Sequence, residues 1–98
     1  MARQFHVYIL TNHTRTVLYT GVTSDLRQRL WQHRNGAGSR FAQRYRVTRL
    51  VYVETWPTAI EAIQREKQIK AGSRQRKLAL IASINPDWRD LAADLGSV

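Results

Sequence analysis

Two short runs of aromatic and β-branched residues near the start of the chain do most to limit the folds it can adopt. Residues 5–11 and 16–21 are rich in Val, Ile, Leu and Tyr, a composition typical of β-strands. Only a turn-forming cluster at residues 12–14 and one further residue separate them. Because so short a connection joins antiparallel neighbours, the two runs predict a β-hairpin.

The rest of the chain alternates between helix and strand patterns. Ser, Thr and Asp residues that can cap helices precede segments that we expect to be helical at residues 26–34, 59–70 and 74–84; the candidates are Thr23-Ser24-Asp25, Thr58 and Ser73. Residues 49–55 predict a third strand, residues 36–46 a Gly-rich basic loop, and Pro86 the start of a short helical turn through Trp88 and Leu91. The order ββαβαα predicts an α/β (α+β) fold, a small three-stranded antiparallel or mixed sheet flanked by helices, in one domain over residues 1–98 with its core at about 5–91.

The charge of the chain favours an acidic partner. It carries 16 Lys and Arg against 7 Asp and Glu in 98 residues, a formal net charge of +9. Nucleic acid is the first candidate, an anionic membrane surface the second, and a basic protein that needs solubility or binds an acidic protein the alternative. The absence of cysteine excludes disulfides, thiolate zinc sites and cysteine nucleophiles. No signal peptide or membrane span is visible, so we expect a cytoplasmic protein.

Charged side chains fall on helix faces that should be buried. With about 100° per residue, Arg29 and His33 lie within roughly 60° of Leu26 on the inward stripe of the first helix. Glu66 falls about 40° from Ala62, inside the apolar arc of the second helix, whereas Glu61 lies on the solvent side. A buried carboxylate needs a cation. Glu66 is therefore either the partner of Arg29 or a ligand of a divalent metal, and His33 either stabilises a helix end or takes part in a site.

Two strand tyrosines stand out beside these charges. Tyr8 lies in the middle of the first strand, and Tyr19 lies on the second strand two residues before Gly21. Strand tyrosines are usually packing residues, and the residues alone leave a structural role open for both.

Four motifs in order resemble those of the GIY-YIG nuclease domains, in particular their small stand-alone bacterial members. The resemblance covers residues 5–91, and the matching segments are Val7-Tyr8-Ile9, Leu18-Tyr19-Thr20-Gly21, Asp25-Leu26 with Arg29-Leu30 and His33, and Ala62 with Glu66. It implies a metal-dependent endonuclease that hydrolyses phosphodiester bonds in nucleic acid, with DNA favoured over RNA, structure-specific and acting in repair or recombination. A non-catalytic nucleic-acid-binding module that kept the fold is the alternative.

The resemblance also implies roles for individual residues. Tyr8 and Tyr19 match the two motif tyrosines, one of which serves as general base while the other assists it, and His33 can relay the proton. Arg29 matches the arginine that neutralises phosphoryl charge. Glu66 matches the ligand of one Mg²⁺ or Mn²⁺ ion. The sequence departs from the family pattern at His6 and at Thr20, and Val22 stands where some relatives carry a lysine.

Basic residues form two groups that can bind phosphates. One surrounds the predicted loop, with Phe41 and Tyr45 interleaved for stacking on unpaired bases, and the other surrounds the junction of the last two helices. Their members, with the late asparagine that the resemblance implies near the site, are Arg40, Arg44, Arg46, Arg49, Lys67, Lys70, Arg74, Arg76, Lys77 and Asn85. A solvated loop is the alternative for the first group, and a protein-contact patch around Trp31 and Trp88 is a further hypothesis. The oligomeric state is left open.

Overall fold

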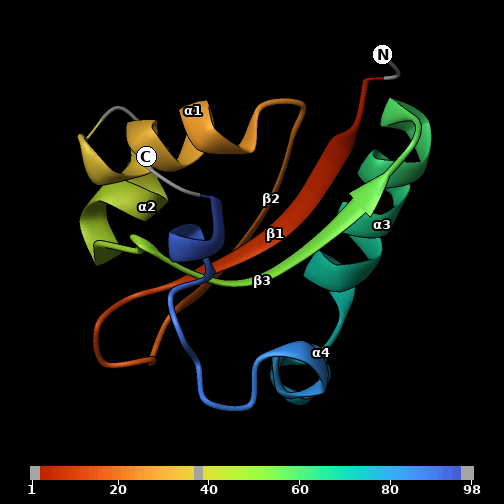
Figure 1. Cartoon of the computed structure of the whole chain (residues 1–98). Helices are drawn as coiled ribbons and strands as arrows, with labels where there is room; N and C mark the ends of the chain where they lie inside the picture. The colour runs from red at the N-terminus through yellow and green to blue at the C-terminus, as the bar shows by residue number, and fades with distance from the viewer. Residues whose placement is uncertain (1–2, 37–38, 96–98) are drawn as a thin grey trace.

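A three-stranded antiparallel sheet forms the centre of the protein, as the fold-class prediction requires. The computed structural model describes residues 3–36 and 39–95. Strands β1 (Phe5–Thr11), β2 (Leu18–Thr23) and β3 (Arg49–Trp56) are arranged in the order β2-β1-β3, and β1 pairs antiparallel with both neighbours. Helices flank this sheet on both sides (Figure 1).

The predicted hairpin is confirmed, although its second strand starts later than expected. The side chain of Asn12 organises the connection, because its Oδ1 accepts hydrogen bonds from the backbone N–H groups of Thr16 (2.9 Å) and Val17 (3.1 Å). Those two residues therefore belong to the turn, and β2 begins at Leu18. The resulting register places Tyr8 directly opposite Gly21.

Three predicted helices and their capping residues are also confirmed. Helices α1 (Leu26–Arg34), α3 (Ala59–Ala71) and α4 (Arg74–Ile84) begin after Asp25, Thr58 and Ser73. Each of these side chains accepts a backbone N–H three residues further along, which satisfies a donor that the helix itself leaves unpaired. Among the described residues, no helix combines the length and apolar character needed to cross a membrane.

Two predictions about connecting segments are wrong. The expected loop at 36–46 contains a fourth helix, α2 (Arg40–Tyr45), which is capped by the Ser39 hydroxyl and closed by Arg46 in the left-handed region at φ 53°. Two of the predicted loop residues, 37 and 38, lie outside the described residues. The final helical turn is a 3₁₀ helix, η1 (Leu91–Leu95), rather than a turn starting at Pro86, since Trp88 also has a left-handed φ of 56°.

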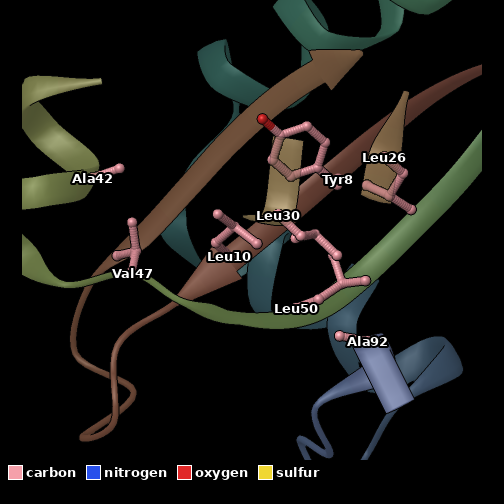
Figure 2. Close-up of a cluster of buried hydrophobic side chains, with 8 residues drawn as sticks. All are labelled: Tyr8, Leu10, Leu26, Leu30, Ala42, Val47, Leu50 and Ala92. Carbon is pink, nitrogen blue, oxygen red and sulfur yellow. The ribbon is translucent and has the colours of Figure 1, made fainter. Parts of the chain in front are cut away.

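The two faces of the sheet carry separate hydrophobic clusters. On one face, Tyr8 and Leu10 pack with side chains of α1, α2 and η1; on the other, Val7 and Ile9 pack with side chains of α3 and α4. The side chains of β1 alternate between the faces, as expected for a strand covered on both sides. Figure 2 shows the Tyr8 ring at the margin of the first cluster, with its hydroxyl pointing away from Leu10 and Leu50.

Candidate functional site

Gly21 provides the space in which the Tyr8 side chain lies. A Cβ atom added at Gly21 would meet Tyr8 Cε1 at 3.0 Å and would lie still closer to Cζ and the hydroxyl oxygen. The phenol therefore crosses the backbone of the edge strand β2 where that strand carries no side chain. This explains why the second motif combines a glycine with a tyrosine: the glycine positions the tyrosine of the neighbouring strand.

Tyr8, Tyr19 and His33 form a compact cluster between the hairpin and α1. The Tyr8 hydroxyl and His33 Nε2 are 3.3 Å apart and share a hydrogen bond. The Tyr19 ring lies edge-on to the His33 ring at 5.3 Å between centroids and is tilted against the Tyr8 ring at 6.4 Å. Three residues from three elements, predicted separately from short motifs, thus come together.

Two charges from different helices act on the Tyr8 phenol. Burial and then the neighbouring Tyr19 raise the pKa of Tyr8 well above its usual value, while the Arg29 guanidinium lowers it and the Glu66 carboxylate raises it. Both charges must lie near the phenol to have this effect. Glu66 comes from α3, which packs on β1 and on the edge strand β2. At neutral pH Tyr8 is therefore an uncharged phenol.

His33 is held as a neutral imidazole with an unused nitrogen. Its side chain is only 4% exposed, and burial together with the nearby Arg29 charge lowers its pKa. Among the described residues, its Nδ1 is the one buried side-chain polar atom without a hydrogen-bond partner. An unpaired buried nitrogen is costly, and such exceptions cluster at sites that act on something outside the protein.

Glu66 is largely buried, as the helix wheel predicted, but its ion-pair partner is not Arg29. The carboxylate is 14% exposed, and Oε1 lies 3.4 Å from Nζ of Lys70, which is 54% exposed. Glu61, by contrast, is exposed and exchanges hydrogen bonds with Thr58 at the start of α3. Within the described ranges, no cluster of three or more His, Asp or Glu side chains is placed to hold a metal, so any ion here would rely on Glu66 as its protein carboxylate.

An aromatic row extends from this cluster to the surface along α2. Phe41 packs on Tyr19 at 6.0 Å between centroids and on Tyr45 at 4.7 Å, and the Arg44 guanidinium lies over the Tyr45 ring. The sequence indicated stacking by Phe41 and Tyr45 but missed the contact between Phe41 and Tyr19, because the segment was expected to be a loop. The four-residue spacing of the two aromatics after Ser39, a good capping residue, was the signal for a helix.

The predicted basic residues lie in two separate places. Arg40, Arg44 and Arg46 are exposed on α2 and its end, close to the aromatic row. The second group lies on α3 and α4 and comprises Lys67, Lys70, Arg74 and Lys77. Lys70 pairs with Glu66, whereas Arg74 and Lys77 donate to backbone carbonyls.

Asn85, the late asparagine that the resemblance implies near the site, lies in the part of the fold where α4 ends. It is buried at the end of α4, where its amide donates to the carbonyls of Val51 and Arg89 and accepts from the Arg89 N–H. One of these bonds fixes the end of α4 to β3, the other two hold the loop that follows α4, and none of them involves the tyrosine cluster. The structure thus gives this residue a packing role.

Comparisons with known proteins agree with this geometry. A family model described as the GIY-YIG catalytic domain matches residues 4–79, a range that includes the tyrosine cluster, Arg29 and Glu66 and stops before Asn85. The chain is similar to a UPF0213 protein of Staphylococcus saprophyticus, with 45% identity over 65 residues that cover 66% of this chain and 79% of that protein. A UPF0213 protein of Staphylococcus epidermidis is 44% identical over 64 residues, covering 65% and 78%.

A solved structure resembles the whole arrangement. It is the solution NMR structure of a UPF0213 protein from Bacillus halodurans, which superimposes with a TM-score of 0.55 at 27% identity and covers 97% of this chain and 99% of that one.

Proposed function

Because the chain belongs to the GIY-YIG nuclease domain family, we propose that it hydrolyses phosphodiester bonds in nucleic acid, with DNA as the favoured substrate. The observation that carries this proposal is the Tyr8–His33 hydrogen bond at 3.3 Å, on which the charges of Arg29 and Glu66 both act. A substrate with a branched or nicked structure, and a place in repair or recombination, are finer parts of the same proposal.

The contacts support different tasks for the two tyrosines. Tyr8 is 1% exposed, its phenolate is disfavoured, and its hydroxyl is engaged with His33. Tyr19 is half-buried and packs on the same histidine from the side of α2. Tyr19 is therefore the better general base, since as a phenolate it would take the proton of the attacking water, while Tyr8 and the neutral His33 share a hydrogen bond beside it.

Arg29 is suited to the charge that develops on the phosphoryl group. Its guanidinium lies near both Tyr8 and His33, to judge from its effect on both pKa values. A planar fork of donors matches two phosphate oxygens at once. In this partly buried setting, such a donor stabilises the transition state more strongly than it would in open water.

A divalent metal fits the donor chemistry around Glu66. Mg²⁺ and Mn²⁺ accept sites with one carboxylate, because water and substrate phosphate supply the other oxygens. Glu66 is the acidic side chain that acts on Tyr8, and its partner Lys70 is exposed enough to move away when another cation binds. One bound Mg²⁺ or Mn²⁺ would supply Lewis-acid polarisation of the phosphate and stabilise the leaving oxygen.

The proposal is tested by comparing two glutamates of the same helix. Glu66→Gln removes the charge that would bind the metal. Glu61→Gln makes the same chemical change at an exposed capping residue. Nicked, branched and single-stranded substrates are incubated with each protein in Mg²⁺ or Mn²⁺. We expect cleavage to fall by about 100-fold or more in Glu66→Gln, the loss typical for one electrostatic catalytic group, and to stay within about threefold in Glu61→Gln.

Equal cleavage by the wild type and Glu66→Gln would refute the catalytic role. The competing function is a nucleic-acid-binding module without catalysis, which the net charge of +9 and the exposed arginines of α2 favour. Salt-dependent binding by the wild type, with no metal-dependent cleavage of any substrate, would select that alternative.

A further inference from the structure

A basic pocket lies directly beside the tyrosine cluster. It has a volume of about 680 Å³ and is bounded by the turn after β1, the end of α1, helix α2 and the start of β3, and His33 forms part of its wall. Pockets that hold small ligands measure about 300–1,000 Å³. The space is far larger than a phosphate ion needs and is of the size that a nucleotide fills.

The charges around the pocket select an anion. Arg46 and Arg49 line it, and neither guanidinium has a hydrogen bond or an ion pair within the described part of the chain. Arg34 also lines it but is neutralised by Asp90 at 2.9 Å. None of the described lining residues is acidic. Two unpaired guanidinium groups at one pocket favour a phosphate group.

Two further features of the wall point to a ligand. His33 is nine-tenths buried, lines the pocket, and leaves its Nδ1 without a partner. Arg46 occupies the left-handed region at φ 53°, where glycine would be strain-free and an arginine costs about 1 kcal/mol. The Tyr45 ring completes the wall and offers a surface on which a base can stack.

We propose that this pocket binds one nucleotide of the substrate strand, with its phosphate on Arg46 and Arg49 and its base against Tyr45. The inference rests on the proposed nuclease function, because it is the Tyr8–His33 hydrogen bond that connects the pocket to the reacting phosphate. A nucleotide seated here lies next to the one that is cut, with its base on the Tyr45 ring and beside the wall that His33 forms. The pocket is thus a place where the enzyme can distinguish one base from another.

Binding is measured first, without metal or cleavage. Amide NMR spectra of the whole chain are recorded with the four deoxynucleoside monophosphates and with inorganic phosphate. We expect shifts at the pocket residues and at least one nucleotide that binds about tenfold more tightly than phosphate does. Equal affinity for phosphate and all nucleotides would overturn the assignment, as would the absence of shifts at the pocket.

The variant Arg46→Gly removes the charge while keeping a backbone that glycine prefers. We expect it to fold at least as well as the wild type and to bind the nucleotide about tenfold more weakly. The matched control Arg89→Gln removes one charge from an exposed residue that pairs with Asp94 outside the pocket. Equal weakening by both variants would overturn the proposal, because it would reduce the effect to net charge.

Cleavage kinetics then separate a strand nucleotide from a free one. With an oligonucleotide substrate, Arg46→Gly is expected to raise KM about tenfold and to relax the base preference next to the cut. An unchanged KM with weakened mononucleotide binding would overturn the assignment to the strand. The two proposals can be refuted separately. Nucleotide binding without any cleavage would refute the nuclease function alone, and cleavage without nucleotide binding would refute the assignment of the pocket alone.

Discussion

Replacing Gly21 by alanine tests whether the shape of β2 positions Tyr8, the tyrosine of the first motif. The added Cβ would lie 3.0 Å from Tyr8 Cε1 and closer still to Cζ and the hydroxyl oxygen, so the ring must move. Tyr8 is packed among buried side chains on the α1 face and cannot move freely. Overfilling such a site costs about 1–3 kcal/mol, which lowers the Tm of a domain of this size by about 4–8 °C for each kcal/mol.

The same displacement should separate the Tyr8 hydroxyl from His33. The cleavage rate per folded molecule should therefore fall as well, beyond what the loss of stability explains. Thermal denaturation and single-turnover cleavage are measured for Gly21→Ala, with Gly72→Ala as the control, where the atom nearest the new Cβ is the Ile69 carbonyl oxygen at 3.3 Å. Combining Gly21→Ala with Tyr8→Phe should cost less than the sum of the two changes, because the hydroxyl is part of the overlap. A Gly21→Ala protein as stable and as active as the wild type would refute the reasoning.

Three further predictions concern stability. His33 has a lowered pKa in the folded protein, so the unfolded chain binds more protons and the free energy of unfolding should decline as pH falls below about 6.5. Denaturation between pH 7.5 and 5.5 should show a smaller decline in His33→Asn than in the wild type. The same dependence on pH in both proteins would contradict this. Glu54 accepts hydrogen bonds from Tyr52, Trp56 and Arg65, so Glu54→Ala should cost about 1–3 kcal/mol in urea denaturation by stranding these donors, and a loss below about 0.5 kcal/mol would count against it. Asn85→Ala should cost a similar amount, with cleavage per folded molecule unchanged; a specific loss of kcat would restore a direct role in the reaction.

Much of the fold was predictable because local signals and tertiary packing agree. Asp25, Thr58 and Ser73 cap their helices as single-residue chemistry demands. The alternation of β1 between two buried faces follows from a run of apolar and aromatic residues. Prediction failed where a side chain bonds to backbone groups that a strand would otherwise use. The Asn12 side chain accepts hydrogen bonds from the N–H groups of Thr16 and Val17, and β2 therefore begins later than predicted.

The candidate site was only partly predictable, because its contacts cross between elements. The helix wheel placed Glu66 on a buried face correctly, but it could not show that Lys70, one turn further on, would be the partner instead of Arg29. The burial that raises the pKa of Tyr8 and the crossing of its ring over Gly21 depend on strand register. Helix α2 was missed, and with it the contact between Phe41 and Tyr19.

Buried polar groups on the two faces of the sheet differ in how completely they are hydrogen-bonded. On the α3 and α4 side, Glu54 accepts from three donors and Asn85 uses both of its own. On the α1 and α2 side, His33 leaves a buried nitrogen unpaired and shares its other nitrogen with the Tyr8 hydroxyl. A fold gains nothing from such a cost by itself. An unpaired nitrogen in the side chain that contacts Tyr8 fits the proposal that this face is organised for a substrate, while the opposite face is stabilised by polar groups with full sets of partners.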